Sequence, residues 1–182
     1  MTRARHRCVF LDRDGVITKA LVREGKPYAP TDLSQLELAQ EASKALLRLK
    51  QRGFLLIVVT NQPDVARGLT RLEMVAAMHE KLATQVPVDD FFVCYHDDAD
   101  CCACRKPSPG LLLQAAEKHG IDLERSFMIG DRWRDVEAGQ RAGCRTIMLD
   151  RGYRERQPAQ APNLRASSLT EAIDWILEKE KE

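Results

Sequence analysis

Short apolar runs alternate along the chain with longer stretches in which apolar residues recur every three or four positions. The run from Phe54 to Thr60 is continuous and rich in β-branched residues, which is typical of a strand buried on both faces of a sheet. Shorter runs predict four further strands, at 8–11, 91–95, 127–129 and 146–149. Between these runs, helical spacing such as that from Ala42 to Leu49 predicts five helices, at about 39–51, 70–85, 109–119, 134–142 and 169–179.

The alternation of strands and helices predicts an α/β fold, a Rossmann-like parallel sheet with helices on both faces. The third helix is expected to begin at Pro109 behind a Ser108 cap, and to end at Gly120. The segment from Ile17 to Leu33 is too interrupted for a helix and is expected to form a loop or small flap. Residues 151–167 are expected to be an irregular surface connection. No insertion is long enough for a large cap domain.

Polar residues follow three of the predicted strands at the point where each strand ends. Asp12 and Asp14 follow the first strand, Thr60 and Asn61 end the second, and Asp131 comes after the strand at 127–129. Because ligands of parallel sheets bind at the carboxyl ends of the strands, these side chains are expected to converge in space.

The pair Asp12 and Asp14 needs a physical explanation of its own. Side chains two residues apart in a strand point to the same side, and two carboxylates that close repel each other. Either a cation or a shared proton must therefore stabilise the pair. The sequence predicts a reaction centre at this position.

Composition narrows the possible partners. The 182 residues carry 28 basic and 27 acidic side chains, a net charge of +1, and no basic tract, so nucleic-acid binding is not expected. No apolar run approaches the roughly 20 residues of a membrane span, and the run 8–11 is shorter than a signal-peptide core of about 7–15 residues. We therefore expect one domain over 1–182, in a cytoplasmic protein with no membrane partner; a monomer is the default expectation.

Four of the six cysteines lie between residues 94 and 104. In a chain without an export signal, such clustering favours a metal site over disulfides. The pairs Cys94 with His96, and Cys102 with Cys104, supply four ligands for a tetrahedral, structural Zn²⁺. Cys101 is interpreted as a spare thiol, and a reduced cluster without metal is the alternative.

The motifs together resemble those of the haloacid dehalogenase-like phosphatases. The first is the run Asp12–Val16, and the second is Thr60 at a strand end. The third is Lys106, within Cys-Arg-Lys-Pro, and the fourth is the run Gly130–Asp135. All four occur in the family's order over residues 9–135.

The resemblance implies a role for each motif residue. Asp12 attacks phosphorus and forms an aspartyl-phosphate, while Asp14 acts as general acid and then general base. Thr60 and Lys106 donate to the phosphoryl oxygens. Mg²⁺ is bound by Asp12, the backbone carbonyl of Asp14, and Asp131. Asp135 supports the metal without binding it directly.

The zinc loop joined to Cys-Arg-Lys-Pro resembles one branch of this family, which contains heptose bisphosphate 7-phosphatases and histidinol-phosphate phosphatases. That resemblance implies a sugar-phosphate substrate contacted by Asn61, Gln62, Arg105 and Arg132. The leading hypothesis is removal of the 7-phosphate of D-glycero-D-manno-heptose 1,7-bisphosphate. Histidinol-phosphate hydrolysis and a non-catalytic zinc-bearing interaction domain are the alternatives. His79 is expected at the surface.

Overall fold

Six parallel strands form the central sheet, in the order β5-β4-β1-β6-β7-β8, in a computed structural model that describes residues 6–180. Their bounds are β1 (Cys8–Leu11), β4 (Leu55–Asn61), β5 (Asp90–Cys94), β6 (Phe127–Gly130), β7 (Arg145–Leu149) and β8 (Leu164–Ala166). The five predicted strands are confirmed, and β1 matches its predicted bounds. The order places β4 and β6 on either side of β1, so the three strands with polar ends are neighbours.

The sequence predicts an irregular connection over residues 151–167 and gives no indication of strand β8. Its three residues carry no alternating pattern, and pairing with β7 defines it. Asn163 extends that pairing: its backbone N–H donates to the Thr146 carbonyl at 2.9 Å and its side chain accepts from the Thr146 N–H at 2.7 Å.

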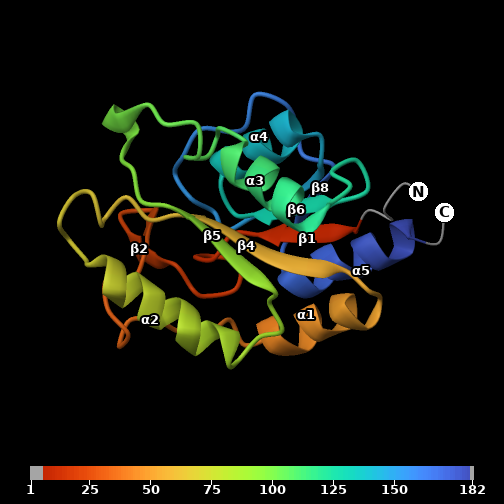
Figure 1. The fold of residues 1–182 in the computed structure, drawn as a ribbon, viewed down its shortest axis with the longest axis horizontal. Coiled ribbons are helices and arrows are strands. Elements are labelled where there is room, and N and C mark those ends of the chain that lie inside the picture. Colours follow the sequence, from red (N-terminus) through yellow and green to blue (C-terminus); the bar gives the residue numbers. More distant parts are fainter. Residues whose placement is uncertain (1–5, 181–182) are drawn as a thin grey trace.

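Helices cover both faces of the sheet, as predicted (Figure 1). On one face lie α1 (Ala42–Gln51), α2 (Leu72–Ala83) and α5 (Leu169–Lys179); on the other lie α3 (Gly110–His119) and α4 (Trp133–Ala142). Alternate strand residues separate two apolar cores: Val9 and Leu11 of β1 pack toward α1 and α5, whereas Cys8 and Phe10 pack toward α3 and α4. No helix among the described residues has the length and apolarity to cross a bilayer.

A small antiparallel hairpin, β2 (Leu21–Arg23) with β3 (Lys26–Tyr28), follows β1 and is the flap predicted for this segment. Its turn places Glu24 and Gly25 at positive φ, 52° and 77°, the conformation that two-residue hairpin turns need.

The predicted start of the third helix is wrong by one residue. Helix α3 begins at Gly110, Pro109 occupies the N-cap position, and no side-chain bond caps this end. At this end the Gly110 N–H donates to the Ala103 carbonyl at 3.1 Å, and a Cβ on Gly110 would lie 2.2 Å from the same oxygen, so the start of α3 packs tightly on the cysteine-rich loop. Gly120 ends the helix with a φ of 62°, as predicted.

Candidate active site

The predicted convergence of the strand ends is present. Asp12 directly follows β1, and its backbone N–H donates to the Ile129 carbonyl of neighbouring β6 at 3.0 Å. Thr60 lies near the end of β4 and Asp131 directly follows β6. All three are at least nine-tenths buried, so their polar atoms depend on one another for partners.

Lys106 enters this cluster from the loop before α3. Only 2% of the residue is exposed, and its ammonium contacts Asp12 Oδ1 at 2.9 Å and Asp135 Oδ1 at 2.6 Å. It also donates to the Val59 carbonyl at 2.7 Å. Burial alone lowers the pKa of Lys106, but the two carboxylates outweigh burial and raise it. The side chain is therefore a fixed positive charge beside Asp12.

The loop before α3 is hydrogen-bonded to the end of β4. The Asn61 side chain donates to the Lys106 carbonyl at 3.0 Å and accepts from the Lys106 N–H at 3.1 Å. This reciprocal pair sets where the lysine backbone lies. Asn61 thus has a clear structural task in addition to the substrate contact expected for it.

Three carboxylates, those of Asp12, Asp131 and Asp135, each offer an oxygen within 4.8 Å of the others. Burial raises the pKa of Asp12 to about 6, against the opposing effect of Lys106. Burial, followed by the charges of Asp12 and Asp135, raises the pKa of Asp131 well above its usual range. Such a cluster favours either protonation or a cation.

The partners of these carboxylates separate their roles. Asp135 has both oxygens occupied, Oδ1 by Lys106 and Oδ2 by the Arg132 backbone N–H at 3.0 Å. Asp131 Oδ1 is buried without a hydrogen-bond partner among the described residues. An unpartnered buried carboxylate oxygen is costly, so Asp12 and Asp131 are the residues suited to hold a hard cation, with Asp135 behind them.

Asp14 lies in a separate hydrogen-bond network. Arg13 donates from Nε to Asp14 Oδ1 and from Nη2 to Oδ2, both at 2.9 Å. Gln62 donates to Oδ2 at 3.0 Å and Thr18 to Oδ1 at 3.1 Å. Asp14 does not belong to the three-carboxylate cluster. Both of its carboxylate oxygens instead accept hydrogen bonds from Arg13 and its neighbours.

Gln62 belongs to this network and does not line the cavities described below. It is 1% exposed, and its amide also donates to Thr60 Oγ1 at 2.9 Å. The sequence predicted a substrate contact for Gln62. The structure places it between Thr60 and Asp14, and the substrate contact stays a prediction.

The network includes two residues for which the sequence predicted no part, Arg13 and His79. Arg13 is completely buried, and its Nη1 lies 3.2 Å from His79 Nε2. The expectation that His79 is a surface residue is wrong: it is 8% exposed and stacks on Phe91. Burial, then the charge of Arg13, lowers the pKa of His79 to about 4.

The sequence contains a pattern that indicates the burial of His79. The buried residues of α2 are Val75, Met78, His79 and Leu82, so the histidine falls on the apolar face of the helix.

Cys94, His96, Cys102 and Cys104 come together as predicted. The three sulfur–sulfur distances are 3.2, 3.3 and 3.6 Å, and His96 Nδ1 lies 3.4 Å from Cys104 and 3.6 Å from Cys94. Ligands about 2.0–2.3 Å from a tetrahedral metal lie roughly 3.5–3.8 Å from one another, close to these values. The four residues could hold one metal ion. Cys101 is exposed and outside the cluster.

An arginine-lined cavity of about 240 Å³ opens beside Asn61. The hairpin, the loop after β4, the cysteine-rich loop and the start of α4 line it, and its charged residues are Lys26, Asp64, Arg67, Asp98, Arg105, Arg132, Arg134 and Glu155. Arg105 donates to Asp98 at 2.8 Å, and Arg134 donates to the same carboxylate at 3.0 Å. Arg132 pairs with Glu155. The positive charge of this cavity suits an anionic ligand.

Comparisons with known proteins agree with this geometry. A family model described as HAD-hydrolase-like matches residues 103–172. The D-glycero-beta-D-manno-heptose-1,7-bisphosphate 7-phosphatase of Helicobacter pylori strain J99 is 34% identical over 179 residues, covering 94% of this chain and 97% of the relative. The D-glycero-D-manno-heptose-1,7-bisphosphate 7-phosphatase of Thermosynechococcus vestitus is 30% identical over 190 residues, covering 92% and 94%.

A solved structure is also similar to this chain. It is the D,D-heptose 1,7-bisphosphate phosphatase from B. bronchiseptica, complexed with magnesium and phosphate, with a TM-score of 0.81 and 28% identity. The alignment covers 95% of this chain and 99% of that one.

Proposed function

The chain belongs to the haloacid dehalogenase-like phosphatases, and from this premise we propose that it is a Mg²⁺-dependent enzyme that removes the 7-phosphate of D-glycero-D-manno-heptose 1,7-bisphosphate. The observation that carries the proposal is the buried cluster at the strand ends, in which Lys106 lies against Asp12 while Asp131 Oδ1 has no partner among the described residues. The names of the relatives support the substrate.

Asp12 is the nucleophile in this proposal. Its attack on phosphorus gives an aspartyl-phosphate and divides one difficult displacement into two easier ones. Lys106 keeps Asp12 ionised despite its burial, and with Thr60 donates to the phosphoryl oxygens as their charge grows. These donors are buried and already in place, so little reorganisation is needed during reaction.

Asp14 is the proton carrier. It accepts hydrogen bonds from Arg13, Gln62 and Thr18, and it must leave at least part of this network to protonate a leaving oxygen. It then takes a proton from the water that hydrolyses the intermediate.

Asp12 and Asp131 would hold Mg²⁺ through their carboxylate oxygens, and the backbone carbonyl of Asp14 would be a third ligand, as the resemblance implies. The bound cation would reduce the repulsion between a carboxylate and a phosphate dianion. Asp135 holds Lys106 and the Arg132 N–H in place beside these ligands.

Zn²⁺ is the proposed occupant of the Cys94, His96, Cys102 and Cys104 site, with a structural role because four protein ligands leave no open position. The arginine-lined cavity, with Arg105 and Arg132, is proposed to take the rest of the substrate, including its second phosphate. The single domain, monomeric state and cytoplasmic location expected from the sequence stay predictions.

The first test is phosphate release from a panel of substrates: both anomers of the heptose bisphosphate and histidinol phosphate, with and without Mg²⁺. We expect Mg²⁺-dependent release that is fastest with one heptose bisphosphate. Asp12→Asn should reduce the rate at least about a thousandfold while the protein stays folded. Asp174→Asn, at an exposed aspartate paired with Arg48, is the matched control and should keep full activity.

Faster turnover of histidinol phosphate would instead support the other activity of the branch. If neither compound releases phosphate from the zinc-containing protein, the alternative of a non-catalytic domain holds.

A further inference from the structure

A tyrosine outside the four motifs contacts Asp131. Tyr153 follows β7, and its hydroxyl donates to Asp131 Oδ2 at 2.8 Å. Asp131 is 1% exposed, and its other oxygen, Oδ1, is the one without a hydrogen-bond partner among the described residues. The two oxygens of this carboxylate therefore have different environments.

This difference matters for the cation proposed to bind there. Mg²⁺ demands nearly ideal octahedral geometry, so a ligating carboxylate must present one oxygen in a defined direction. The phenol occupies one lone pair of Oδ2, whereas Oδ1 has no hydrogen-bond partner among the described residues and is the oxygen left free for a cation. The hydrogen bond also fixes the rotation of the carboxylate about its own axis.

Gly15 packs against the same pair of atoms. A Cβ at this position would lie 1.7 Å from Asp131 Oδ2 and 3.1 Å from the Tyr153 hydroxyl oxygen. The bare backbone of Gly15, held at a φ of +88°, thus fills the space behind the bonded oxygen. The backbone of Gly15 therefore limits the movement of the Asp131 carboxylate and the Tyr153 hydroxyl.

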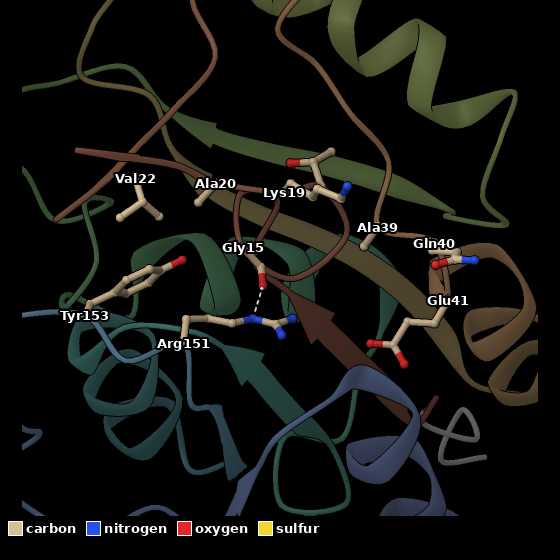
Figure 2. Close-up of a pocket in the computed structure, with 10 residues that line it drawn as sticks. Gly15, Lys19, Ala20, Val22, Ala39, Gln40, Glu41, Arg151 and Tyr153 are labelled. Carbon is tan, nitrogen blue, oxygen red and sulfur yellow. Dashed lines mark hydrogen bonds between the residues drawn. The ribbon is translucent and has the colours of Figure 1, made fainter. Parts of the chain in front are cut away.

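The segment 151–154 fixes the position of the tyrosine. Arg151 Nε donates to the Gly15 carbonyl at 3.0 Å, the dashed line in Figure 2. The Arg154 N–H donates to the Gly25 carbonyl, in the hairpin turn, at 2.8 Å. Residues on either side of Tyr153 are thereby bonded to the turn after β1 and to the hairpin.

Tyr153 and Gly15 also line a second cavity, of about 600 Å³, shown in Figure 2. This cavity adjoins the Tyr153–Asp131 pair and is distinct from the arginine-lined cavity. Without the hydroxyl, the Asp131 carboxylate would lose its donor on this side.

We propose that Tyr153 is a positioning residue for the cation site, one that holds Asp131 through Oδ2 and leaves Oδ1 free for the cation it would bind. The inference rests on the proposed function, because it takes Asp131 as a Mg²⁺ ligand. Tyr153 lies outside the four motifs, in the segment 151–167, for which the sequence predicts only an irregular connection.

The test is a calorimetric titration of the zinc-loaded full chain with Mg²⁺ alone, without substrate. Tyr153→Phe keeps the ring and removes the hydroxyl. We expect its Mg²⁺ dissociation constant to rise about 10–100-fold, the usual effect of losing an outer partner of a metal ligand. The hydroxyl of Tyr95 makes no hydrogen bond to the residues between 6 and 180, so the control variant Tyr95→Phe should bind Mg²⁺ as the parent does.

Two further measurements separate positioning from a general loss of structure. The Mg²⁺-free Tyr153→Phe protein should still unfold cooperatively, with a thermal midpoint only a few degrees below that of the parent, because Asp131 Oδ2 loses its donor. The Mg²⁺ concentration that gives half-maximal activity should rise by the same factor as the dissociation constant, with kcat at saturating Mg²⁺ largely retained. Arg151→Gln, which keeps the phenol but removes the bond to Gly15, should show a smaller loss of Mg²⁺ affinity.

Unchanged Mg²⁺ affinity in folded Tyr153→Phe would overturn the proposal, and so would an equal loss in Tyr95→Phe. Because the titration contains no substrate, a chain that acts on a different phosphate ester would still give the expected result. A parent protein that binds no Mg²⁺ would overturn both the inference and the cation site on which it rests.

Discussion

Asp12 and Asp14 are the same residue type two positions apart, yet their surroundings differ. Asp12 is buried beside Lys106 and close to two further carboxylates. Asp14 is bound on both oxygens by Arg13 and further held by Gln62 and Thr18. The assignment of nucleophile and proton carrier, made from motif position, is compatible with this difference in environment.

Gly15 has no room for a side chain beside Asp131. Gly15→Ala should reduce phosphatase activity at least about a hundredfold, because its Cβ would lie 1.7 Å from Asp131 Oδ2 and displace a proposed metal ligand. The free energy of unfolding, measured in urea, should fall by about 1–3 kcal/mol because of overpacking, and by about 1 kcal/mol more because a side chain is placed at positive φ.

The matched control is Gly53→Ala. Gly53 has a similar φ of +78°, but a Cβ there would meet nothing within 4 Å. This variant should show only the backbone cost and keep full activity. Equal losses of activity in the two variants would contradict the steric argument.

At the scale of elements, the loop between β5 and α3 is the least regular part of the site and carries Lys106. Its cysteines and His96 gather at one end, while Asn61 bonds the Lys106 backbone at the other. Gly110 packs against Ala103, so the loop is also in close contact with the start of α3. A metal in this loop would therefore stabilise the segment that delivers the lysine.

Metal content tests this interpretation. Cys102→Ser should lose the zinc, which we expect at about one equivalent per chain in the parent protein, and its activity should fall because Lys106 is less firmly placed. Cys101→Ser is the control from the neighbouring position and should keep both zinc and activity, since Cys101 is exposed and outside the cluster. Loss of zinc from Cys101→Ser alone would reverse the ligand assignment.

At the scale of the whole molecule, the sheet order explains why distant motifs meet. Neighbouring β4, β1 and β6 end at one edge, so residues 12, 60 and 131 share one site. The helices on the two faces bury this arrangement between two apolar cores. Behind Asp14, the buried Arg13 contacts His79, so the site and the packing of α2 share one network.

The burial of His79 predicts how global stability depends on pH. Its pKa is about 4 in the folded protein, against about 6.5 in an unfolded chain. As the pH falls below about 6.5, His79 becomes protonated in the unfolded state but stays neutral in the folded state. The free energy of unfolding therefore decreases until the pH reaches about 4, where His79 is protonated in both states. Between pH 7.5 and 5.0 the expected loss is on the order of 2 kcal/mol.

His79→Gln removes this titration and keeps a hydrogen-bond acceptor near Arg13. We expect the free energy of unfolding in urea to decrease less between pH 7.5 and 5.0 for His79→Gln than for the parent. The difference between the two decreases should be about 2 kcal/mol. His6→Gln, at an exposed histidine, controls for the loss of one imidazole. The same decrease in the parent and in His79→Gln would mean that His79 does not titrate as expected.

Local patterns in the sequence determined much of this protein. Apolar patterns located the five longer strands and the five α-helices of residues 6–180, because the periods of strands and helices are local properties. The spacing of Cys94, His96, Cys102 and Cys104 predicted a cluster that the fold does form. Polar residues at strand ends predicted which distant residues would meet, because parallel strands bring their carboxyl ends to one edge.

Only the tertiary structure decided what depends on contacts between distant segments. The short β8 exists through pairing with β7, and the contact of His79 with Arg13 and Phe91 joins segments that are far apart in the sequence. The bond from Tyr153 to Asp131 is of the same kind, since nothing near residue 153 in the sequence indicates it. Local sequence encodes backbone preference and amphipathic pattern, whereas the partner of a buried polar atom is set by which segments the fold brings together.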